Sequence, residues 1–280
     1  MMAHKSKLRR FLRHPSGLFG LTILVAIVGM ATTASIFYPD GPWPMVARPM
    51  LWPGQDPRYA LGTDVMGRDL VAGLMHGSRV SVMVGLATAT VAVLFGTFVG
   101  AIAGYYNGRI DDLLMRITDA FQTIPSFMAA VVIVGVIGPS VTTVICSISF
   151  VSWPMIARLA RAEFLRLRNY DFVQACRVMG MSDTRIIITQ VLPNGLSPII
   201  VASSVLVATA IIVESSLSFL GLGDPNVISW GAIIGAGRSV MRTAWYITII
   251  PATALVLTVL SLNLIGDAVN DVLNPRLRSR

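Results

Sequence analysis

Long apolar runs alternate with short polar segments along most of the chain. Each run has about the length that an α-helix needs to cross a bilayer at about 1.5 Å per residue. The apolar positions are continuous rather than alternating, which favours helices over a transmembrane barrel. The runs cover 17–38 and about 80–104, 117–138, 140–160, 196–220 and 245–266. The pattern predicts an all-α, polytopic membrane protein with six transmembrane helices.

These runs set the domain boundaries that we expect. The parts are an N-terminal tail (1–16), a first transmembrane helix (17–38), an external loop (39–79), a five-helix transmembrane core (80–270) that contains a long polar loop (161–195), and a C-terminal tail (271–280). The first run is longer than the apolar core of a signal peptide, which has about 7–15 residues, so we interpret it as an uncleaved helix. Prolines break helical structure in the external loop, and Trp43 and Trp52 suit a membrane interface.

Composition and charge agree with this picture. Only 13% of the residues are charged, whereas a soluble domain has about 25%. The net charge of +8 is carried by short segments between apolar runs, which argues against a nucleic-acid partner. With the N-terminus inside, 16 of the 22 lysines and arginines fall on the inner side. Because basic residues favour the cytoplasmic side, we expect both termini to be cytoplasmic.

The longest cytoplasmic segment contains the amphipathic stretch DFVQACRVMGMSDTRIIITQVLPN. Its apolar spacing predicts a short helix over 171–179, which ends at Gly180 because glycine has the lowest cost in a left-handed helix terminus. Ser182 or Asp183 can cap a second short helix that ends at Pro193. Two interpretations stay open. The stretch is either a pair of interfacial helices that lie on the membrane or an elbow that docks a cytoplasmic partner.

The stretch QACRVMG, followed by Leu192-Pro193, resembles the EAA loop of bacterial ABC importer permeases. Gln174, Ala175 and Cys176 occupy the EAA positions, and Gly180 occupies the glycine position. The chain departs from the pattern in Gln for Glu, in Cys for the second Ala, and in Gln190 where the general pattern has Ile.

Four longer stretches are similar to the dipeptide/oligopeptide/nickel permease family, and specifically to its second, C-type subunit. They are LGTDVMGRD (61–69), ESSLSFLGLG (214–223), SWGAII (229–234) and NLIGDAVNDVLNPRL (263–277). The resemblance implies the type I importer permease fold and a place in the bacterial inner membrane. It also implies a heterodimer with a second permease subunit, two cytoplasmic ATPase subunits and an external substrate-binding protein.

The resemblance further implies what the elbow and the pathway do. The elbow would be the coupling helix that contacts an ATPase subunit, through Asp171, Gln174, Ala175, Cys176, Gly180, Ser182 and Asp183. The expected cargo is a short peptide, and nickel or another small solute handled by the same family is the alternative.

Two further sets of residues are candidates for function. The external loop motif contains Gly62, Asp64, Gly67, Arg68 and Asp69, which either form tight turns with locally paired charges or receive the binding protein. Glu214, Ser215 and Ser218 follow an uncharged apolar run. An acid in or near a membrane is costly and often functional. This set therefore belongs either to the translocation path or gate, or to a structural pairing near SFLGLG.

Other chemistry is not indicated by the sequence. A P-loop needs a lysine after its glycines, and the only lysines are Lys5 and Lys7 in the N-terminal tail. ATP and Mg are therefore expected in partner subunits, with no cofactor in this chain. No catalytic residues and no metal ligands are predicted, because no triad and no His/Cys ligand spacing occurs. Two other classes of membrane protein are alternatives. An ion-gradient-driven secondary transporter would often show internal repeats, which are absent, and the third class is a structural membrane scaffold.

Overall fold

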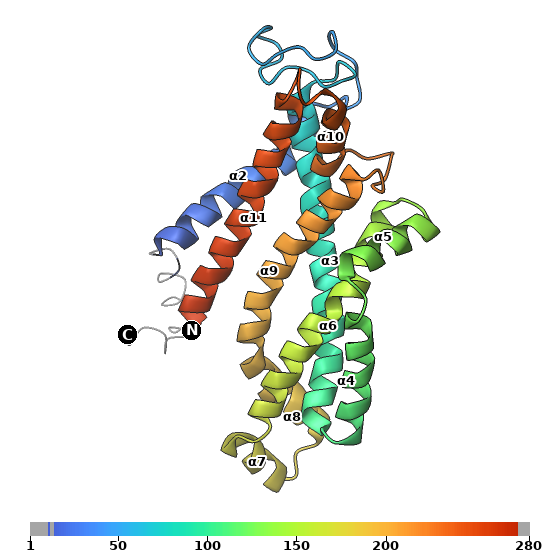
Figure 1. The fold of residues 1–280 in the computed structure, drawn as a ribbon. Helices are drawn as coiled ribbons and strands as arrows, with labels where there is room; N and C mark the ends of the chain where they lie inside the picture. The colour runs from blue at the N-terminus through green and yellow to red at the C-terminus, as the bar shows by residue number, and fades with distance from the viewer. Residues whose placement is uncertain (1–10, 12–13, 274–280) are drawn as a thin grey trace.

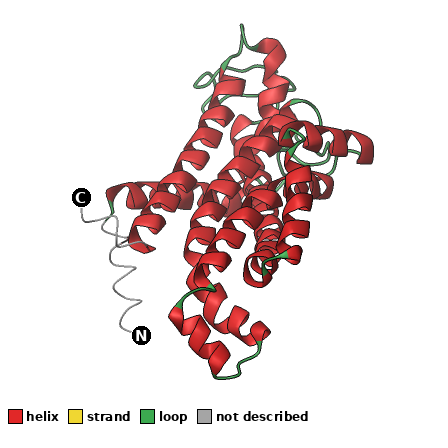
Figure 2. Ribbon diagram, turned by 60° about the horizontal axis from the view of Figure 1, so that its bottom comes forward, coloured by secondary structure: helices red, strands yellow, loops and turns green. Residues whose placement is uncertain are grey.

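The computed structural model describes Phe11 and residues 14–273, and within this part the chain is almost entirely helical (Figures 1 and 2). The predicted tails at 1–16 and 271–280 lie mostly outside the described residues. The elements are α2 (Pro15–Phe37), α3 (Leu70–Tyr106), α4 (Arg109–Gln122), α5 (Ser126–Ile137), α6 (Val141–Leu167), α7 (Asp171–Val178), α8 (Asp183–Ile186), the π-helical turn η1 (Ile187–Val191), α9 (Leu192–Phe219), α10 (Trp230–Gly237), the 3-10 turn η2 (Arg238–Val240) and α11 (Tyr246–Leu273). The predicted all-α class is confirmed.

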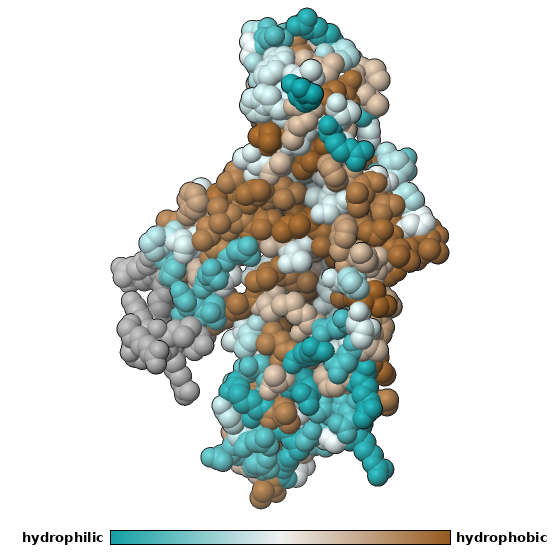
Figure 3. All heavy atoms as spheres, viewed as in Figure 1, coloured by the Kyte–Doolittle hydropathy of each residue, from teal (hydrophilic) through white to brown (hydrophobic). Residues whose placement is uncertain are grey.

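Five helices of the described chain are long and apolar enough to cross a membrane, and α4 with α5 makes a sixth span if that bent pair is counted as one. Figure 3 shows a broad apolar band across the middle of the molecule, between a hydrophilic end that carries α7 and a hydrophilic end that carries the long loop after α2. This distribution is the one that a membrane-spanning helical protein requires.

The third apolar run is not one straight span. We predicted a single helix over 117–138, but the structure breaks it into α4 and α5, which are bent by 78°. The break lies beside Pro125, which directly precedes α5. Proline has no N–H to donate and disfavours helical geometry in the residue before it. The prediction of one continuous helix was therefore wrong.

The external loop is shorter than predicted. α3 begins at Leu70, so the last ten residues of the predicted loop, 70–79, are helical. The Asp69 carboxylate caps this helix by accepting a hydrogen bond from the Val71 N–H at 2.8 Å. Arg79 therefore lies inside α3, where its Nε donates to the Ala31 carbonyl of α2 at 3.1 Å. Arg79 thus joins two spans rather than facing outward from a loop.

Glycines at four-residue spacing allow α3 and α6 to approach closely. Gly96, Gly100 and Gly104 share one face of α3, and all three are buried against α6. A Cβ added at Gly100 would lie 2.7 Å from the Cβ of Ala160, and it would also overlap the carbonyl oxygen of Ala157. Small residues at this spacing are a common device for packing membrane helices. The α3–α6 pair forms the centre to which the elbow is attached.

Ion pairs join α4 to α6 near the elbow end. Arg161 donates two hydrogen bonds to the Asp111 carboxylate, at 2.5 and 2.6 Å, and Asp111 is buried. Arg158 donates to Asp119 at 2.6 Å. The bidentate geometry of the Arg161–Asp111 pair is specific for the relative placement of the two groups. They hold the amphipathic helix α4 against the core at a defined rotation.

Candidate functional site

The elbow lies at one end of the molecule, where α7 and α8 project beyond the long helices (Figure 1). α7 covers Asp171–Val178, one residue short of the helix predicted from the apolar spacing. Gly180 has φ = +78°. The Gly180 N–H donates to the Arg177 carbonyl at 2.9 Å, and the Met181 N–H donates to the Cys176 carbonyl at 3.1 Å. This pair of hydrogen bonds is the Schellman motif, and it ends the helix at the predicted glycine.

Gly180 is needed for its backbone conformation and not for space. A Cβ at this position would meet nothing within 4 Å. A residue other than glycine at this φ costs about 1 kcal/mol or more. The turn between α7 and α8 therefore prefers glycine because of its backbone conformation, and not because neighbouring atoms leave no room for a side chain.

The second part of the elbow differs from the prediction. Ser182 is the N-cap of α8, but its side chain makes no capping hydrogen bond. The helix does not end at Pro193. It passes from α8 through the π turn η1 into α9, which runs to Phe219. Because Pro193 cannot donate to the preceding turn, the helix widens into a π turn just before it instead of stopping.

One face of the elbow packs against the rest of the chain. Val173 and Cys176 are buried in an apolar cluster with residues of α3, α6, α8 and η1. Its other buried members are Ala101, Tyr105, Phe164, Leu167, Ile186 and Val191. Cys176 was predicted to offer a small side chain to a partner, and that placement is wrong, because Val173 and Cys176 share one helical face and only 8% of Cys176 is exposed. Ala175 lies on the exposed face.

The exposed face of the elbow carries large apolar side chains. Val178 is 89% exposed and Met179 is 71% exposed, and Phe172 is also exposed. Asp171 and Ala175 lie on the surface of the same short helix. A contiguous apolar surface at a hydrophilic end of a protein is typical of a protein-binding site. This surface is distinct from the buried face that holds the elbow to α3 and α6.

A tyrosine at the end of α3 fixes the elbow in place. The Tyr105 hydroxyl donates to Asp183 Oδ1 at 2.6 Å, and the Arg177 guanidinium lies 5.1 Å from the centre of the Tyr105 ring. Arg168 donates to the Tyr105 carbonyl at 2.8 Å, and Gln174 donates to the Arg168 carbonyl at 3.0 Å. No local sequence pattern selects Tyr105, since its contact to Asp183 joins segments 78 residues apart.

Glu214 lies inside the helix bundle, with 3% of its surface exposed. Its Oε1 accepts from the Ser218 hydroxyl at 2.8 Å, and its Oε2 accepts from Ser81 at 3.1 Å and from Ser215 at 3.3 Å. These bonds connect α9 to α3, which is the structural pairing that the sequence left open. Glu214, Ser215 and Ser218 are all buried. Their role in a gate stays a prediction.

The external loop motif forms tight turns, as one of its two interpretations required. Gly62 and Gly67 have φ = +76° and +81°, and a Cβ at either position would overlap a backbone carbonyl of the same loop. The predicted local pairing of charges is wrong. Asp64 Oδ1 accepts from the backbone N–H groups of Met66 at 2.8 Å and Arg68 at 2.9 Å, and Asp69 caps α3. The Arg68 guanidinium instead stacks on an aromatic ring.

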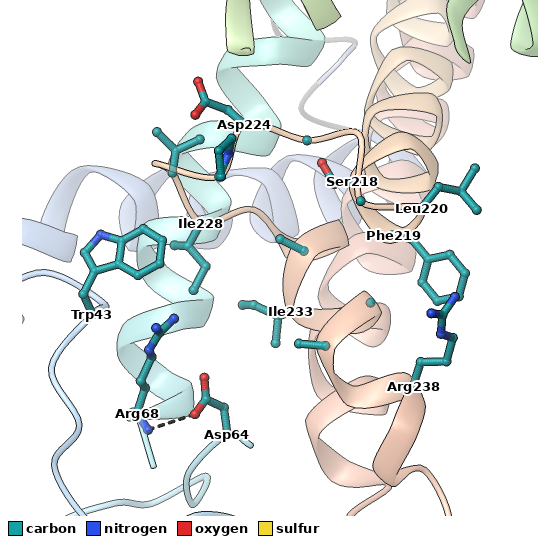
Figure 4. Close-up of a pocket in the computed structure, with 17 residues that line it drawn as sticks. Trp43, Asp64, Arg68, Ser218, Phe219, Leu220, Asp224, Ile228, Ile233 and Arg238 are labelled. Carbon is teal, nitrogen blue, oxygen red and sulfur yellow. Dashed lines mark hydrogen bonds between the residues drawn. The ribbon is translucent and has the colours of Figure 1, made fainter. Parts of the chain in front are cut away.

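The structure brings two separately predicted sets together in one pocket. Asp64 and Arg68 of the external loop and Ser218 of α9 line a pocket of about 460 Å³, together with the α9–α10 connection and α10 (Figure 4). We call it the outer pocket. It lies at the end of the molecule opposite the elbow. Residues 14–273 contain no group of three or more His, Cys, Asp or Glu side chains that is placed to hold a metal ion.

Two family models match the chain. The model described as "Binding-protein-dependent transport system inner membrane component" matches residues 96–279, and the model described as "N-terminal TM domain of oligopeptide transport permease C" matches residues 5–60. The first match contains the elbow and the second contains the first apolar run.

Curated relatives cover nearly the whole chain. A putative peptide transport system permease protein of Brucella abortus is 38% identical over 277 residues, which are 96% of this chain and 91% of the relative. A di/tripeptide transport system permease protein of Pseudomonas aeruginosa is 34% identical over 275 residues, covering 96% of this chain and 91% of the relative. An oligopeptide transport system permease protein of Haemophilus influenzae is 35% identical, covering 96% and 88%.

A solved structure has the same fold. It is described as an inward-facing conformation of the MetNI methionine ABC transporter, and the match has a TM-score of 0.61 at 18% identity. It covers 71% of this chain and 96% of the solved chain. At this level of identity the match supports the predicted fold alone.

Proposed function

The chain belongs to the family of binding-protein-dependent transport system inner membrane components, and from this membership we propose that it forms half of the translocation pathway of an ATP-driven importer for short peptides. It is a multi-pass inner-membrane protein of a family that transports rather than catalyses. The names of its relatives support peptides as the cargo, rather than the nickel alternative.

This proposal rests on the structure of the elbow, which has one buried face and one exposed face. Its buried face attaches it to α3 and α6, and Phe172, Val178 and Met179 are exposed on its other face. In the proposed complex this exposed face sits against an ATPase subunit, whose movements on ATP binding turn the elbow. The rigid attachment then moves the helices of the pathway.

The complex that we propose contains this chain and three other kinds of component. A second permease subunit completes the pathway, two cytoplasmic ATPase subunits bind ATP and Mg, and an external binding protein delivers the peptide. This chain supplies no Walker lysine, since its two lysines lie in the N-terminal tail. The proposed orientation places both termini and the elbow in the cytoplasm and the outer pocket outside.

Single cysteines at Gln55 and Thr184 test this orientation. In a background in which Cys146 and Cys176 are replaced by alanine, a membrane-impermeant thiol reagent should label the cysteine at Gln55 only from outside and the cysteine at Thr184 only from inside. Both native side chains are exposed, so access to the reagent depends on the side of the membrane. Comparison of thiol labelling in intact and in permeabilised cells measures on which side each cysteine lies. The reverse pattern would contradict the orientation and the cytoplasmic place of the elbow.

Tyr105→Phe tests whether the elbow transmits movement to α3. The variant keeps the buried ring but removes the hydroxyl that donates to Asp183. Hydrogen bonds to charged groups contribute about 1.5–3 kcal/mol, so we expect peptide uptake to fall roughly ten-fold while the ATPase subunits still associate. Uptake and ATP hydrolysis by the assembled transporter are measured together.

The neighbouring Tyr106→Phe is the matched control for this test. Tyr106 is exposed and also follows directly on Tyr105 at the end of α3. Its hydroxyl makes no hydrogen bond among the described residues, so uptake should stay normal. Equal uptake by the two variants would mean that the Tyr105–Asp183 bond has no part in coupling.

A further inference from the structure

The outer pocket contains an arginine whose hydrogen-bonding capacity is not used. Arg68 extends from the external loop with its guanidinium 4.9 Å from the centre of the Trp43 ring. Its Nε is buried and has no hydrogen-bond partner among the described residues. Figure 4 shows the guanidinium directed into the pocket, between Trp43 and Ile233. A buried donor left unbonded is costly, and in native proteins it calls for a partner.

A second arginine stands on the other side of the pocket. Arg238 lies 5.5 Å from the centre of the Phe219 ring, and Ile233 separates it from Arg68 (Figure 4). Neither arginine is within ion-pair distance of a carboxylate in the part of the chain that the structure describes. The pocket therefore has a stacked guanidinium group on either side of an apolar surface that includes Ile228 and Ile233.

The acidic side chains of the pocket are already bonded. Asp64 Oδ1 accepts from two backbone N–H groups of its own loop. Asp224 accepts from the Asn226 N–H at 2.9 Å and from the Val141 N–H at 3.2 Å. The N–H of Asn226, and after it that of Val141, holds the pKa of Asp224 below its ordinary value. The carboxylates of the lining are thus held by the backbone, while the guanidinium groups remain available for a ligand.

We propose that the outer pocket binds the carboxylate end of a short peptide, with the carboxylate on the Arg68 guanidinium and the adjoining side chain over Ile228 and Ile233. A guanidinium presents parallel N–H groups that match a carboxylate. The volume of about 460 Å³ is in the range of small-ligand sites and exceeds what one inserted side chain needs. This inference rests on the proposed function. It adds that the permease itself recognises the terminal carboxylate of the peptide.

Ligand-observed saturation-transfer NMR tests the site in the assembled transporter, in nanodiscs and without the external binding protein. The probes are dialanine and dialanine amide, which differ in the terminal carboxylate. Dialanine should bind and the amide should bind at least about ten-fold more weakly, because the charge-assisted hydrogen bonds are lost. Arg68→Gln should weaken dialanine binding by a similar factor, and Arg68→Lys should weaken it less because the charge is retained.

Two further variants make the result specific. Arg58→Gln is the matched control, since Arg58 belongs to the same loop but is paired with Asp56 and does not line the pocket. It should leave dialanine binding unchanged. Ala236→Phe adds bulk from an exposed residue of the lining without altering charge, and it should weaken binding even if Arg68→Gln fails to fold.

Several outcomes would overturn the proposal. Equal binding of dialanine and its amide would show that the terminal carboxylate is not recognised. Normal dialanine binding by both Arg68→Gln and Ala236→Phe would show that the outer pocket is not the binding site. If Arg68→Gln instead weakened only the association of the external binding protein, the pocket would be a docking surface for that protein. Co-purification of the ATPase subunits is measured on the same samples. If dialanine binding does not depend on the carboxylate or on Arg68 but the ATPase subunits still co-purify, only the carboxylate site is refuted and the proposed function stands. If the ATPase subunits do not associate with the native protein, the proposed function itself is contradicted.

Discussion

Gly180→Val and Ala175→Trp are expected to reach the membrane at normal levels and to abolish peptide uptake. Gly180 has φ = +78°, which a β-branched residue tolerates poorly. Valine should therefore redirect the chain between α7 and α8. Ala175 is exposed on α7, so tryptophan does not disturb the buried face of the elbow but prevents close contact with an ATPase subunit. Membrane abundance, co-purification of the ATPase subunits and uptake are measured on each variant.

Two matched variants separate coupling from general damage. Gly180→Asn should retain much of the uptake, because asparagine tolerates a left-handed conformation far better than valine. Asp112→Trp places the same large side chain at an exposed residue of α4, outside the elbow, and should leave ATPase association intact. Normal uptake by both Gly180→Val and Ala175→Trp would mean that the elbow is only a pair of interfacial helices.

Features that depend on neighbouring residues were predictable from the sequence. The apolar runs identify the long helices because each run must be continuous to cross a membrane. The end of α7 at Gly180 followed from the cost of a left-handed conformation, and the φ value agrees with it. The start of α3 was missed although the signal was present. Asp69 directly precedes an apolar run and caps the helix, but the polar residues of its first turns were read as loop.

Features that depend on distant residues were not predictable. Glu214 could not be assigned to a pairing or a path from its own surroundings, because the serine that bonds it from α3 is 133 residues away. Cys176 was placed on the wrong face because its motif position says nothing about which side of a short helix the core occupies. The outer pocket joins the external loop to the α9–α10 connection, and no local pattern indicates that these segments meet.

The elbow is held by both helices of the central pair, which gives the packing of that pair a functional meaning. Tyr105 closes the end of α3, and Arg168 follows the end of α6. The Tyr105 hydroxyl donates to Asp183 of the elbow, the Arg168 side chain donates to the Tyr105 carbonyl, and Gln174 of the elbow donates to the Arg168 carbonyl. Movement of the elbow is therefore shared between α3 and α6 as long as the two helices stay in register.

Gly100→Leu is expected to separate these helices and to leave little folded protein. The Cβ alone would lie 2.7 Å from the Cβ of Ala160 and would overlap the backbone of α6, which cannot yield as a flexible side chain does. Overpacking a core costs about 1–3 kcal/mol and occasionally more, and contact with backbone places this variant at about 3 kcal/mol or above. Membrane abundance and the thermal stability of the purified transporter measure the loss.

Gly135→Leu makes the same change where the structure offers space. Gly135 is an exposed residue of α5, and a Cβ there would meet nothing within 4 Å. Since glycine is about 1 kcal/mol less favourable than alanine within a helix, this variant should be as stable as the native protein or slightly more so. A comparable loss of stability in both variants would indicate a general intolerance of leucine at helical glycines. Only a loss confined to Gly100→Leu supports close α3–α6 packing as the frame that carries the elbow.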